Sequence, residues 1–328
     1  MTGLFDSWQR QINYLRISVT DHCNLSCVYC SVGSVPHLPR SEILSYEEIQ
    51  HAVQVAARMG ISKVRLTGGE PLLRADLSKL VWMISQIEGI DDISLTSNGI
   101  LLSKYAVELK EAGLKRVNVS LDTLKEDRFK RITGRDKLGE VLSGIEAAHL
   151  AGLNPVKINM VVLQGINDDE TIDFVRMSTS QGWHVRFIEF MPFGMPEAKA
   201  LETVSAQEIQ ERIQSLGKLE PYTGKTGNGP ARYYRLPGAR GTIGFITPMT
   251  EHFCHSCNRL RLTSDGQLRP CLLDDDEVNL KEALRNGAST DELKQLIQQA
   301  VTMKRERHHL TGGLIPGTVR RPMCQIGG

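Results

Sequence analysis

Hydrophobic and polar residues alternate with a period of two along six short segments of the chain. The segments are 13–19, 63–67, 92–97, 116–122, 156–163 and 184–190. This period is typical of β-strands. Between the segments, apolar residues recur at helical spacing. Ile49, Val53 and Ala56, for example, follow a capping box formed by Ser45 and Glu48. Six repeats of strand then helix predict an α/β fold with a parallel sheet and right-handed crossovers.

The predicted strands carry a polar face, whereas parallel strands covered by helices on both sides normally read as continuous apolar runs. The alternate positions are occupied by Arg16, Ser18, Lys63, Arg65, Thr67, Ser94, Thr96, Asn118, Ser120, Asp122, Lys157, Asn159, His184 and Arg186. One interpretation is an open sheet with one face in water. The other is a curled sheet whose polar face lines a lumen. Buried cations without acidic partners carry a desolvation penalty, which a bound polyanion would offset.

The alternating pattern stops near residue 195. The remainder contains a stretch rich in Gly, Pro and Thr, a helix predicted over 289–303, and a tail with little helix or strand signal. We therefore expect 1–195 to form the α/β core and 196–328 to form a C-terminal extension. The composition, with 41% hydrophobic and 23% charged residues, is that of a soluble globular protein. The chain shows no apolar run of roughly 18 residues and no signal peptide, so we expect a cytoplasmic protein without a membrane partner.

Six of the seven cysteines form two sets of three. The first trio, Cys23, Cys27 and Cys30, follows the first predicted strand with C-x3-C-x2-C spacing. Without a secretion signal, metal ligation is favoured over disulfides. Zinc would need a fourth ligand, which His22 or His37 could supply. Three thiolates on a four-iron cluster would instead leave one iron open for chemistry.

The second trio is Cys254, Cys257 and Cys271. A zinc ribbon completed by His252 or His255 is one interpretation. A second iron–sulfur cluster with an open iron is the other. Arg259 and Arg261 lie between these cysteines in the sequence, so such an iron would face more positive charge than the first.

The motif "CNLSCVYC", with an aromatic residue before its last cysteine, resembles the signature of the radical S-adenosylmethionine (SAM) superfamily. This resemblance implies a partial (β/α)6 TIM-like barrel, a [4Fe-4S] cluster, and cleavage of SAM to a 5′-deoxyadenosyl radical. The stretch "TGGEP" at residues 67–71 resembles the superfamily's glycine-rich SAM contact. The SAM contacts implied by the resemblance are Tyr29, Gly68, Gly69, Ser120 and Met191.

The two trios, the stretches "GPARYY" and "RFIEFMPF", and the Gly-Gly end together resemble one branch of that superfamily. Its members are lyases of molybdenum cofactor biosynthesis that remove the ribose 3′ hydrogen of GTP and close that carbon onto C8 of guanine. The resemblance implies two [4Fe-4S] clusters, an external electron donor, and a cyclic pyranopterin monophosphate synthase that takes the product. A homodimer is also expected.

Carried over residue by residue, the branch's GTP contacts are Arg16, Arg65, Thr96, Lys157, Arg259, Leu260 and Arg261. The residues expected to serve catalysis are Arg16, Arg65, Lys157, Arg259, Arg261, Gly327 and Gly328. The final glycines would reach into the active site, whereas a frayed terminus is the alternative. The chain departs from the branch after Cys30, where Ser31, Val32 and Gly33 replace the usual Met-Pro. Cys324 has no assigned role, and a free thiol beside a flexible end is expected.

Two other functions fit part of the sequence. A radical SAM enzyme that modifies peptides could also carry an auxiliary cluster, although its substrate would not need so cationic a lumen. A zinc-stabilised nucleic-acid-binding protein would use the arginines on a polymer's phosphates. The net charge of +1 and the placement of the cations on internal strands favour an enclosed small anion instead.

Overall fold

The computed structural model of the protein describes residues 3–30, 36–191, 201–224, 229–308 and 321–327. Within these ranges, twelve strands form one sheet. They are β1 (Tyr14–Ser18), β2 (Lys63–Thr67), β3 (Asp92–Ser97), β4 (Arg116–Ser120), β5 (Lys157–Val162), β6 (His184–Glu189), β7 (Glu220–Pro221), β8 (Arg232–Arg235), β9 (Thr242–Ile246), β10 (Arg259–Leu262), β11 (Gln267–Arg269) and β12 (Val278–Asn279). Each of the six predicted segments contains one of the strands β1 to β6, so those predictions are confirmed.

The described helices include one after almost every strand of the core. They are α1 (Tyr46–Arg58), α2 (Leu77–Ser85), α3 (Leu102–Glu111), α4 (Glu126–Thr133), α5 (Leu138–Leu150), α6 (Thr171–Ser180), α7 (Ala206–Ile213), α8 (Leu280–Arg285), α9 (Thr290–Thr302) and α10 (Met323–Ile326). Short 3-10 turns occupy Arg40–Glu42, Pro71–Leu73, Asp168–Glu170, Gln214–Leu216 and Cys254–Ser256. No helix in the described ranges has the length and apolar character needed to cross a membrane.

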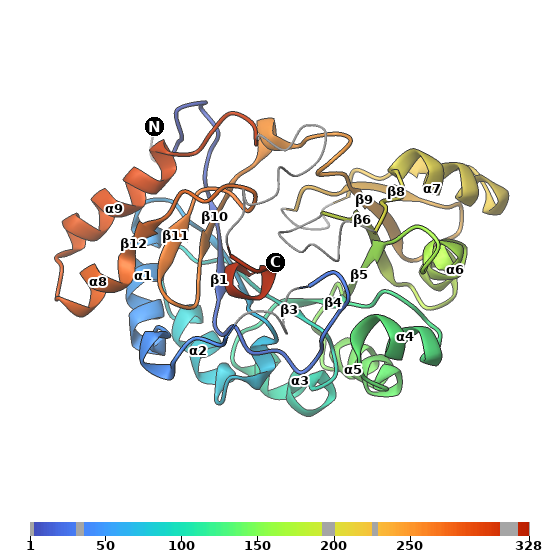
Figure 1. Ribbon diagram of the computed structural model, residues 1–328, viewed down its shortest axis with the longest axis horizontal. Coiled ribbons are helices and arrows are strands. Elements are labelled where there is room, and N and C mark those ends of the chain that lie inside the picture. The colour runs from blue at the N-terminus through green and yellow to red at the C-terminus, as the bar shows by residue number, and fades with distance from the viewer. Residues whose placement is uncertain (1–2, 31–35, 192–200, 225–228, 309–320, 328) are drawn as a thin grey trace.

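Strands β1 to β6 pair in parallel and in chain order. Figure 1 shows this sheet curving around a central space, with α1 to α6 along its outer side. This arrangement is the partial (β/α)6 barrel that the resemblance implies. Two strands from the second part of the chain lengthen the parallel arc: β10 pairs with β1, and β9 pairs with β6. The alternating pattern did not predict β9 and β10, because two isolated strands carry no repeat of their own.

Local sequence explains where the main helices begin. Helices α1, α7 and α9 each start with a capping box, in which a serine and a glutamate three residues later exchange hydrogen bonds. For α1 this is Ser45 with Glu48, as predicted. Its residues Ile49 and Val53 are fully buried against the sheet. Burying an aliphatic side chain of this size stabilises the fold by about 1.5–3 kcal/mol, so this face fixes the helix on the outer side.

The two faces of the sheet differ as the alternation predicts. Leu15, Ile17, Val64 and Leu66 are buried in the main apolar core under the helices. On the opposite face, the register places Arg261, Arg16 and Arg65 directly side by side across β10, β1 and β2. Like charges opposite one another on neighbouring strands repel. The inner face of the barrel therefore carries a row of three arginines that an anion would stabilise.

Candidate active site

One large cavity occupies the inside of the barrel. Its empty volume is about 1620 Å³, including solvent at its mouth. The predicted site residues in its wall are Arg16, Cys23, Cys27, Tyr29, Cys30, Arg65, Gly68, Gly69, Thr96, Ser120, Met191, Arg259 and Arg261. The curled interpretation of the polar face is therefore the correct one. Residues from both ends of the chain meet in this cavity because β10 extends the sheet beside β1.

Some predicted site residues are not among those that line this cavity; of these, the second trio and Gly327 are described below. The side chain of Leu260 lies in the apolar core, beside Leu15, so only its backbone can face a ligand. Lys157 is 2% exposed, with Nζ 5.6 Å from the centre of the Tyr233 ring. Gly328 and the Ser31–Gly33 departure fall outside the described residues.

The first trio is held on the loop after β1 by the end of β2. The backbone N–H groups of Gly69 and Glu70 donate to the carbonyls of Thr20 and His22 at 2.8 and 2.7 Å. A Cβ atom at Gly69 would stand 2.3 Å from the His22 carbonyl oxygen. Glycine is required here because the backbone of "TGGEP" lies directly against the cysteine loop. This contact fixes the start of that loop relative to the sheet.

The spacing of the thiols separates a cluster from a single ion. A tetrahedral zinc site has Zn–S bonds of about 2.3 Å, which put its sulfurs about 3.8 Å apart. Among the described residues, neither cysteine trio has its three Sγ atoms within 4.8 Å of one another. Three thiols spread around a space that lies against a cavity fit a cuboidal cluster, which is larger than one ion. The first trio, which lines the cavity, would therefore hold a [4Fe-4S] cluster at the cavity wall.

Carboxylates surround the first trio. Burial raises the pKa of Cys27, and Asp122 raises it further. Asp122 accepts hydrogen bonds from Tyr29 Oη at 2.5 Å and from the Val161 backbone at 2.8 Å. Burial likewise raises the pKa of Cys23, and Glu70 adds to that effect. The described charged groups that act on these two thiols are thus acidic, which suits a positively charged partner.

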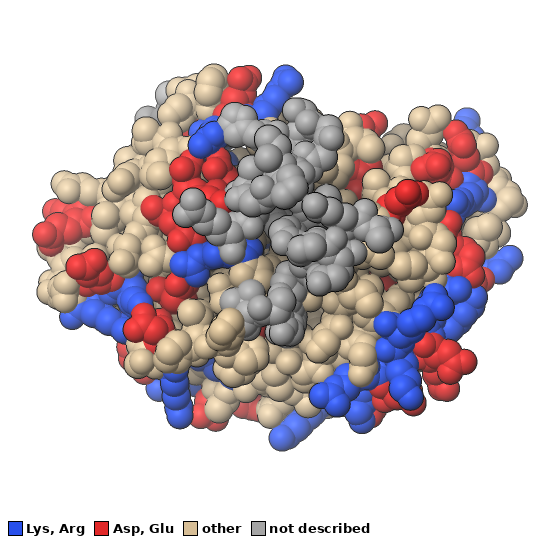
Figure 2. Space-filling view, in the orientation of Figure 1, with Lys and Arg blue, Asp and Glu red and all other residues tan. Residues whose placement is uncertain are grey.

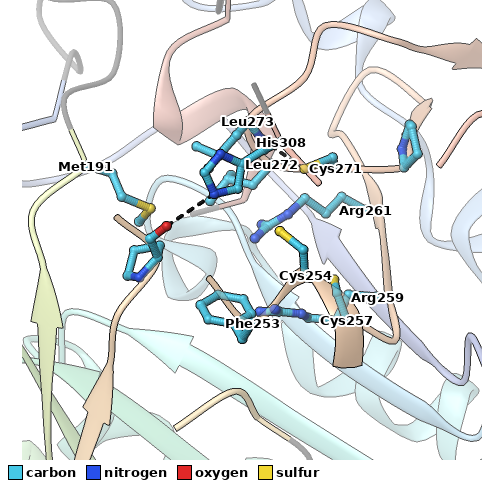
Figure 3. Close-up of a pocket in the computed structure, with 12 residues that line it drawn as sticks. Met191, Phe253, Cys254, Cys257, Arg259, Arg261, Cys271, Leu272, Leu273 and His308 are labelled. Atoms are coloured by element: carbon cyan, nitrogen blue, oxygen red, sulfur yellow. Dashed lines mark hydrogen bonds between the residues drawn. The ribbon is translucent and has the colours of Figure 1, made fainter. Parts of the chain in front are cut away.

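The second trio lines a smaller pocket of about 520 Å³ of empty volume, shown in Figure 3. Burial opposes ionisation of Cys257, but Arg259 and Lys304 outweigh it and lower the pKa to about 6. Lys304 Nζ donates to the carbonyls of Arg259 and Pro270 at 3.1 and 2.7 Å. A thiol beside two cations is readily deprotonated, as metal ligation requires.

Two structural residues of the second trio were not found by sequence reasoning. Lys304, only 4% exposed, connects the segment that follows Cys257 with the residue that precedes Cys271. Arg10 donates to the carbonyl of Cys254 at 2.7 Å and is itself paired with Asp6. Their contacts lie up to 244 residues away in the chain, and no local motif marks them.

Neighbouring cations on the inner face lower one another's pKa values. Burial lowers the pKa of Arg16, and the neighbouring Arg261 and Arg65 lower it further. Burial also lowers the pKa of Lys157 to about 6, with Arg186 as the next cause. The Nε and Nη2 atoms of Arg186 have no hydrogen-bond partner among the described residues. A polyanion would supply the missing acceptors and relieve the repulsion.

The C-terminal residues enter the cavity. Figure 1 places α10 and the C-terminus in the middle of the curved sheet. The carbonyl of Gly327 accepts a hydrogen bond from Arg261 Nη1 at 2.6 Å. Its φ of +69° favours glycine, and a Cβ there would lie 2.6 Å from Thr67 Cγ2. For residues 321–327, the expectation of a frayed end is therefore wrong. Cys324 is a free thiol as expected, but it is buried in the cavity wall.

Comparisons with known proteins agree along the whole chain. A family model described as the Radical SAM superfamily matches residues 17–177, and one described as Molybdenum Cofactor Synthesis C matches residues 183–310. A protein named GTP 3′,8-cyclase from Pelotomaculum thermopropionicum is 53% identical over 326 residues, covering 98% of this chain and 99% of that protein. Another of that name, from Moorella thermoacetica, is 51% identical over 324 residues, with 98% and 99% covered.

Solved structures agree in fold. Streptococcus suis SuiB bound to S-adenosylmethionine has a TM-score of 0.62 with this chain at 16% sequence identity. The likeness covers 88% of this chain and 68% of that one. At this identity the comparison supports the arrangement of helices and strands alone.

Proposed function

The chain belongs to the GTP 3′,8-cyclase family of radical SAM enzymes, and we propose that its barrel holds GTP between two iron–sulfur clusters. It is a lyase of molybdenum cofactor biosynthesis that converts GTP to (8S)-3′,8-cyclo-7,8-dihydroguanosine 5′-triphosphate. The row formed by Arg261, Arg16 and Arg65 carries the GTP assignment, because three guanidinium groups side by side repel one another and a polyanion would offset that repulsion. All three line the cavity that the first trio lines, and Arg261 also lines the pocket of the second trio, so an anion held by this row would lie between the two trios.

The first trio and the residues around it bind SAM. The cluster and SAM, when bound, supply the electron and the 5′-deoxyadenosyl radical of the reaction. Gly68 and Gly69 present backbone to the methionine part of SAM, while Tyr29, Ser120 and Met191 complete the pocket around it. The acidic surroundings of the trio favour the sulfonium cation and the methionine ammonium group.

The second trio would hold a second [4Fe-4S] cluster in the pocket that Arg259 and Arg261 also line. Arg259 and Arg261 hold the nucleotide beside that cluster. Arg16 and Arg65 pair with phosphate oxygens. Thr96 supplies a hydroxyl group to the nucleotide. Lys157 adds positive charge to the phosphate region. Leu260 contributes through its backbone. Gly327 brings the tail against Arg261, and we propose that Gly328 serves catalysis with it.

Other partners follow from the chemistry of the reaction. An external electron donor must reduce the first cluster for each turnover, and a cyclic pyranopterin monophosphate synthase consumes the product. Figure 2 shows Lys and Arg interspersed with Asp and Glu around the visible face, without a broad basic field for nucleic acid. We place the enzyme in the cytoplasm, where its cysteines stay reduced, and we expect a homodimer.

The test is product analysis without oxygen. Protein reconstituted with iron and sulfide should contain about eight irons per chain. Incubation with GTP, SAM and a reductant should yield 5′-deoxyadenosine and a cyclised nucleotide in equal amounts, and omission of GTP should remove the nucleotide. Stoichiometric zinc in a colourless protein, or deoxyadenosine without any GTP-derived product, would contradict the proposal.

A further inference from the structure

Three potential metal ligands gather beside the first cysteine trio without belonging to it. His22 Nε2 lies 3.8 Å from Asp21 Oδ1, and His37 Nδ1 lies 3.5 Å from Asp21 Oδ2. One ligand atom from each residue lies within 4.8 Å of the other two. Among the described residues, this is the only group of three or more His, Cys, Asp or Glu side chains gathered so closely.

The distances fit a shared ion better than direct hydrogen bonds. A hydrogen bond between a ring nitrogen and a carboxylate spans about 2.7–3.2 Å, which is shorter than either Asp21–His distance. Zinc bonds of about 2.0–2.2 Å to nitrogen and oxygen place tetrahedral neighbours about 3.3–3.6 Å apart. The separation of 3.5 Å between His37 Nδ1 and Asp21 Oδ2 falls within that interval, and the separation of 3.8 Å between His22 Nε2 and Asp21 Oδ1 is slightly longer.

One oxygen of the Asp21 carboxylate has no hydrogen-bond partner in the part of the chain that the structure describes. Its side chain is 1% exposed, and Oδ2 accepts a hydrogen bond from the Leu38 backbone at 2.7 Å. The other oxygen, Oδ1, has no hydrogen-bond partner among the described residues. A buried carboxylate oxygen without a donor is costly, and a cation bound to it removes that cost.

The site is accessible and partly preorganised. The His22 and His37 side chains are 51% and 43% exposed, so an ion can enter from solvent. Their rings stack with centres 4.0 Å apart and planes 19° apart, each presenting one nitrogen to Asp21. The backbone on either side of Asp21 is fixed to the end of β2 through the Gly69 and Glu70 N–H groups. Such support is what an ion site needs.

We propose that Asp21, His22 and His37 form a binding site for one divalent cation of the zinc class, separate from both cysteine trios. Two imidazoles and one carboxylate are a ligand set that zinc accepts, with a further position left to water. Because Asp21 precedes the first trio and His37 follows it in the sequence, the ion joins the two ends of the cysteine loop. Its role is to position that loop.

The experiment uses holoenzyme in which iron has been restored and counted. Zinc sulfate is titrated in by calorimetry without oxygen, and metals are counted after desalting. We expect one zinc bound per chain with no loss of iron. The zinc K-edge spectrum should show nitrogen and oxygen neighbours at about 2.0–2.1 Å and no sulfur at about 2.3 Å.

Matched variants locate the ion. His22→Ala and His37→Ala should each weaken zinc binding more than about tenfold, because even changes to second-shell groups cost about 10- to 100-fold. His149→Ala, an exposed histidine whose ring contacts Asn154, should leave the affinity unchanged. Both test residues are exposed, and iron content confirms that each variant keeps its clusters.

Three results would overturn the proposal: no zinc bound to the holoenzyme, sulfur neighbours accompanied by loss of iron, or unchanged affinity in His37→Ala. None of these measurements involves GTP turnover. A failure of the cyclase assignment would therefore leave this test, and its outcome, intact.

Discussion

The two cysteine trios have the same number of thiols but opposite electrostatic surroundings. At the first trio, Glu70 and Asp122 raise the thiol pKa values beyond the effect of burial. At the second, Arg259 and Lys304 reverse the effect of burial and lower the pKa of Cys257 to about 6. The difference does not come from the cysteine spacing. It comes from which strands bring their polar residues beside each loop.

The opposite charges around the two trios match the charges of the two proposed ligands, the sulfonium cation of SAM and the triphosphate of GTP. Carboxylates beside a cluster favour a cationic ligand and stabilise the oxidised cluster, which makes it a stronger reductant. Cations beside the second trio favour an anionic ligand such as the proposed nucleotide, and they would disfavour electron loss from the cluster proposed there. Burial raises the pKa of Glu70 to about 7, so the negative character of the first site grows as the pH rises above neutral.

The largest expected effect comes from removing one thiol at each site. Cys27→Ser should reduce SAM cleavage by more than about a thousandfold, equivalent to about 4 kcal/mol, whether or not GTP is present. Cys271→Ser should abolish the cyclised product but leave slow SAM cleavage without GTP. Reverse-phase analysis of deoxyadenosine and nucleotide products measures both.

Iron content provides the control for the thiol variants. Each should fall from about eight irons per chain to about four, while Cys324→Ser keeps about eight. The two trios would not be separate sites if either variant lost all of its iron.

The second-largest effect is expected from removing one positive charge at the proposed GTP site. Arg261→Met should weaken GTP binding by about 10- to 100-fold, because a hydrogen bond to a charged group contributes about 1.5–3 kcal/mol. SAM affinity should stay the same, since Arg261 belongs to the second site. Calorimetry with each ligand measures the difference, and Arg240→Met, which removes an exposed arginine bonded to the Ser180 carbonyl, is the control. If the variant bound SAM and GTP more weakly to the same extent, the assignment of SAM to the first trio and GTP to the second would be wrong.

The pH dependence of GTP binding tests the buried cations. In the free enzyme the pKa of Lys157 is lowered to about 6, so the amine is neutral above that pH and charged below it. A bound triphosphate raises this pKa, so binding above pH 6 takes up a proton. The dissociation constant for GTP should therefore rise with pH, by up to about tenfold per unit. Calorimetry in buffers of different ionisation heat detects the proton uptake directly.

Lys157→Met is the control for that pH dependence. This variant should bind GTP more weakly. The part of the pH dependence of its GTP dissociation constant that comes from Lys157 should disappear. Titration of the GTP phosphates remains in both proteins and cancels in the comparison. If the GTP dissociation constant changed with pH identically in wild type and variant, Lys157 would not be part of the phosphate site.

Much of the fold was predictable because it rests on local periodicity. Strands β1 to β6 and helix α1 follow from alternation and a capping box, which involve residues close in sequence. The pairing of β10 with β1 joins residues more than 240 positions apart. It depends on the polar face of one strand meeting that of another, and no local pattern specifies the partner.

The residues of the candidate site also fall into two groups, those that local sequence predicts and those that it does not. Arg16, Arg65 and Arg261 were predicted from parity and motif, and they line one cavity. The side chain of Leu260 faces the core because it alternates with Arg259 and Arg261 on the same strand. Lys304 could not be predicted, since it acts through two backbone carbonyls that a sequence motif does not encode.

The smallest expected effect concerns the tail that touches the second site. Arg321 pairs with both oxygens of Asp265, at 3.1 and 2.9 Å, and its Nε lies 2.7 Å from Glu277. These contacts hold α10 so that the Gly327 carbonyl meets Arg261. Arg321→Ala should lower kcat about fivefold, because a largely buried ion pair at the protein surface contributes about 1 kcal/mol, and leave the Tm unchanged because only the tail loosens. Hydrogen exchange should become faster in residues 321–327 alone.

Arg285→Ala is the matched control for the tail, because Arg285 makes a comparable exposed pair with Glu48 between α8 and α1. It should change neither kcat nor exchange in the tail. If Arg321→Ala instead weakens SAM binding as much as it slows turnover, the tail serves the first trio as well as the second. The two sites would then share one closing element, and their opposite charges would act on a single enclosed space.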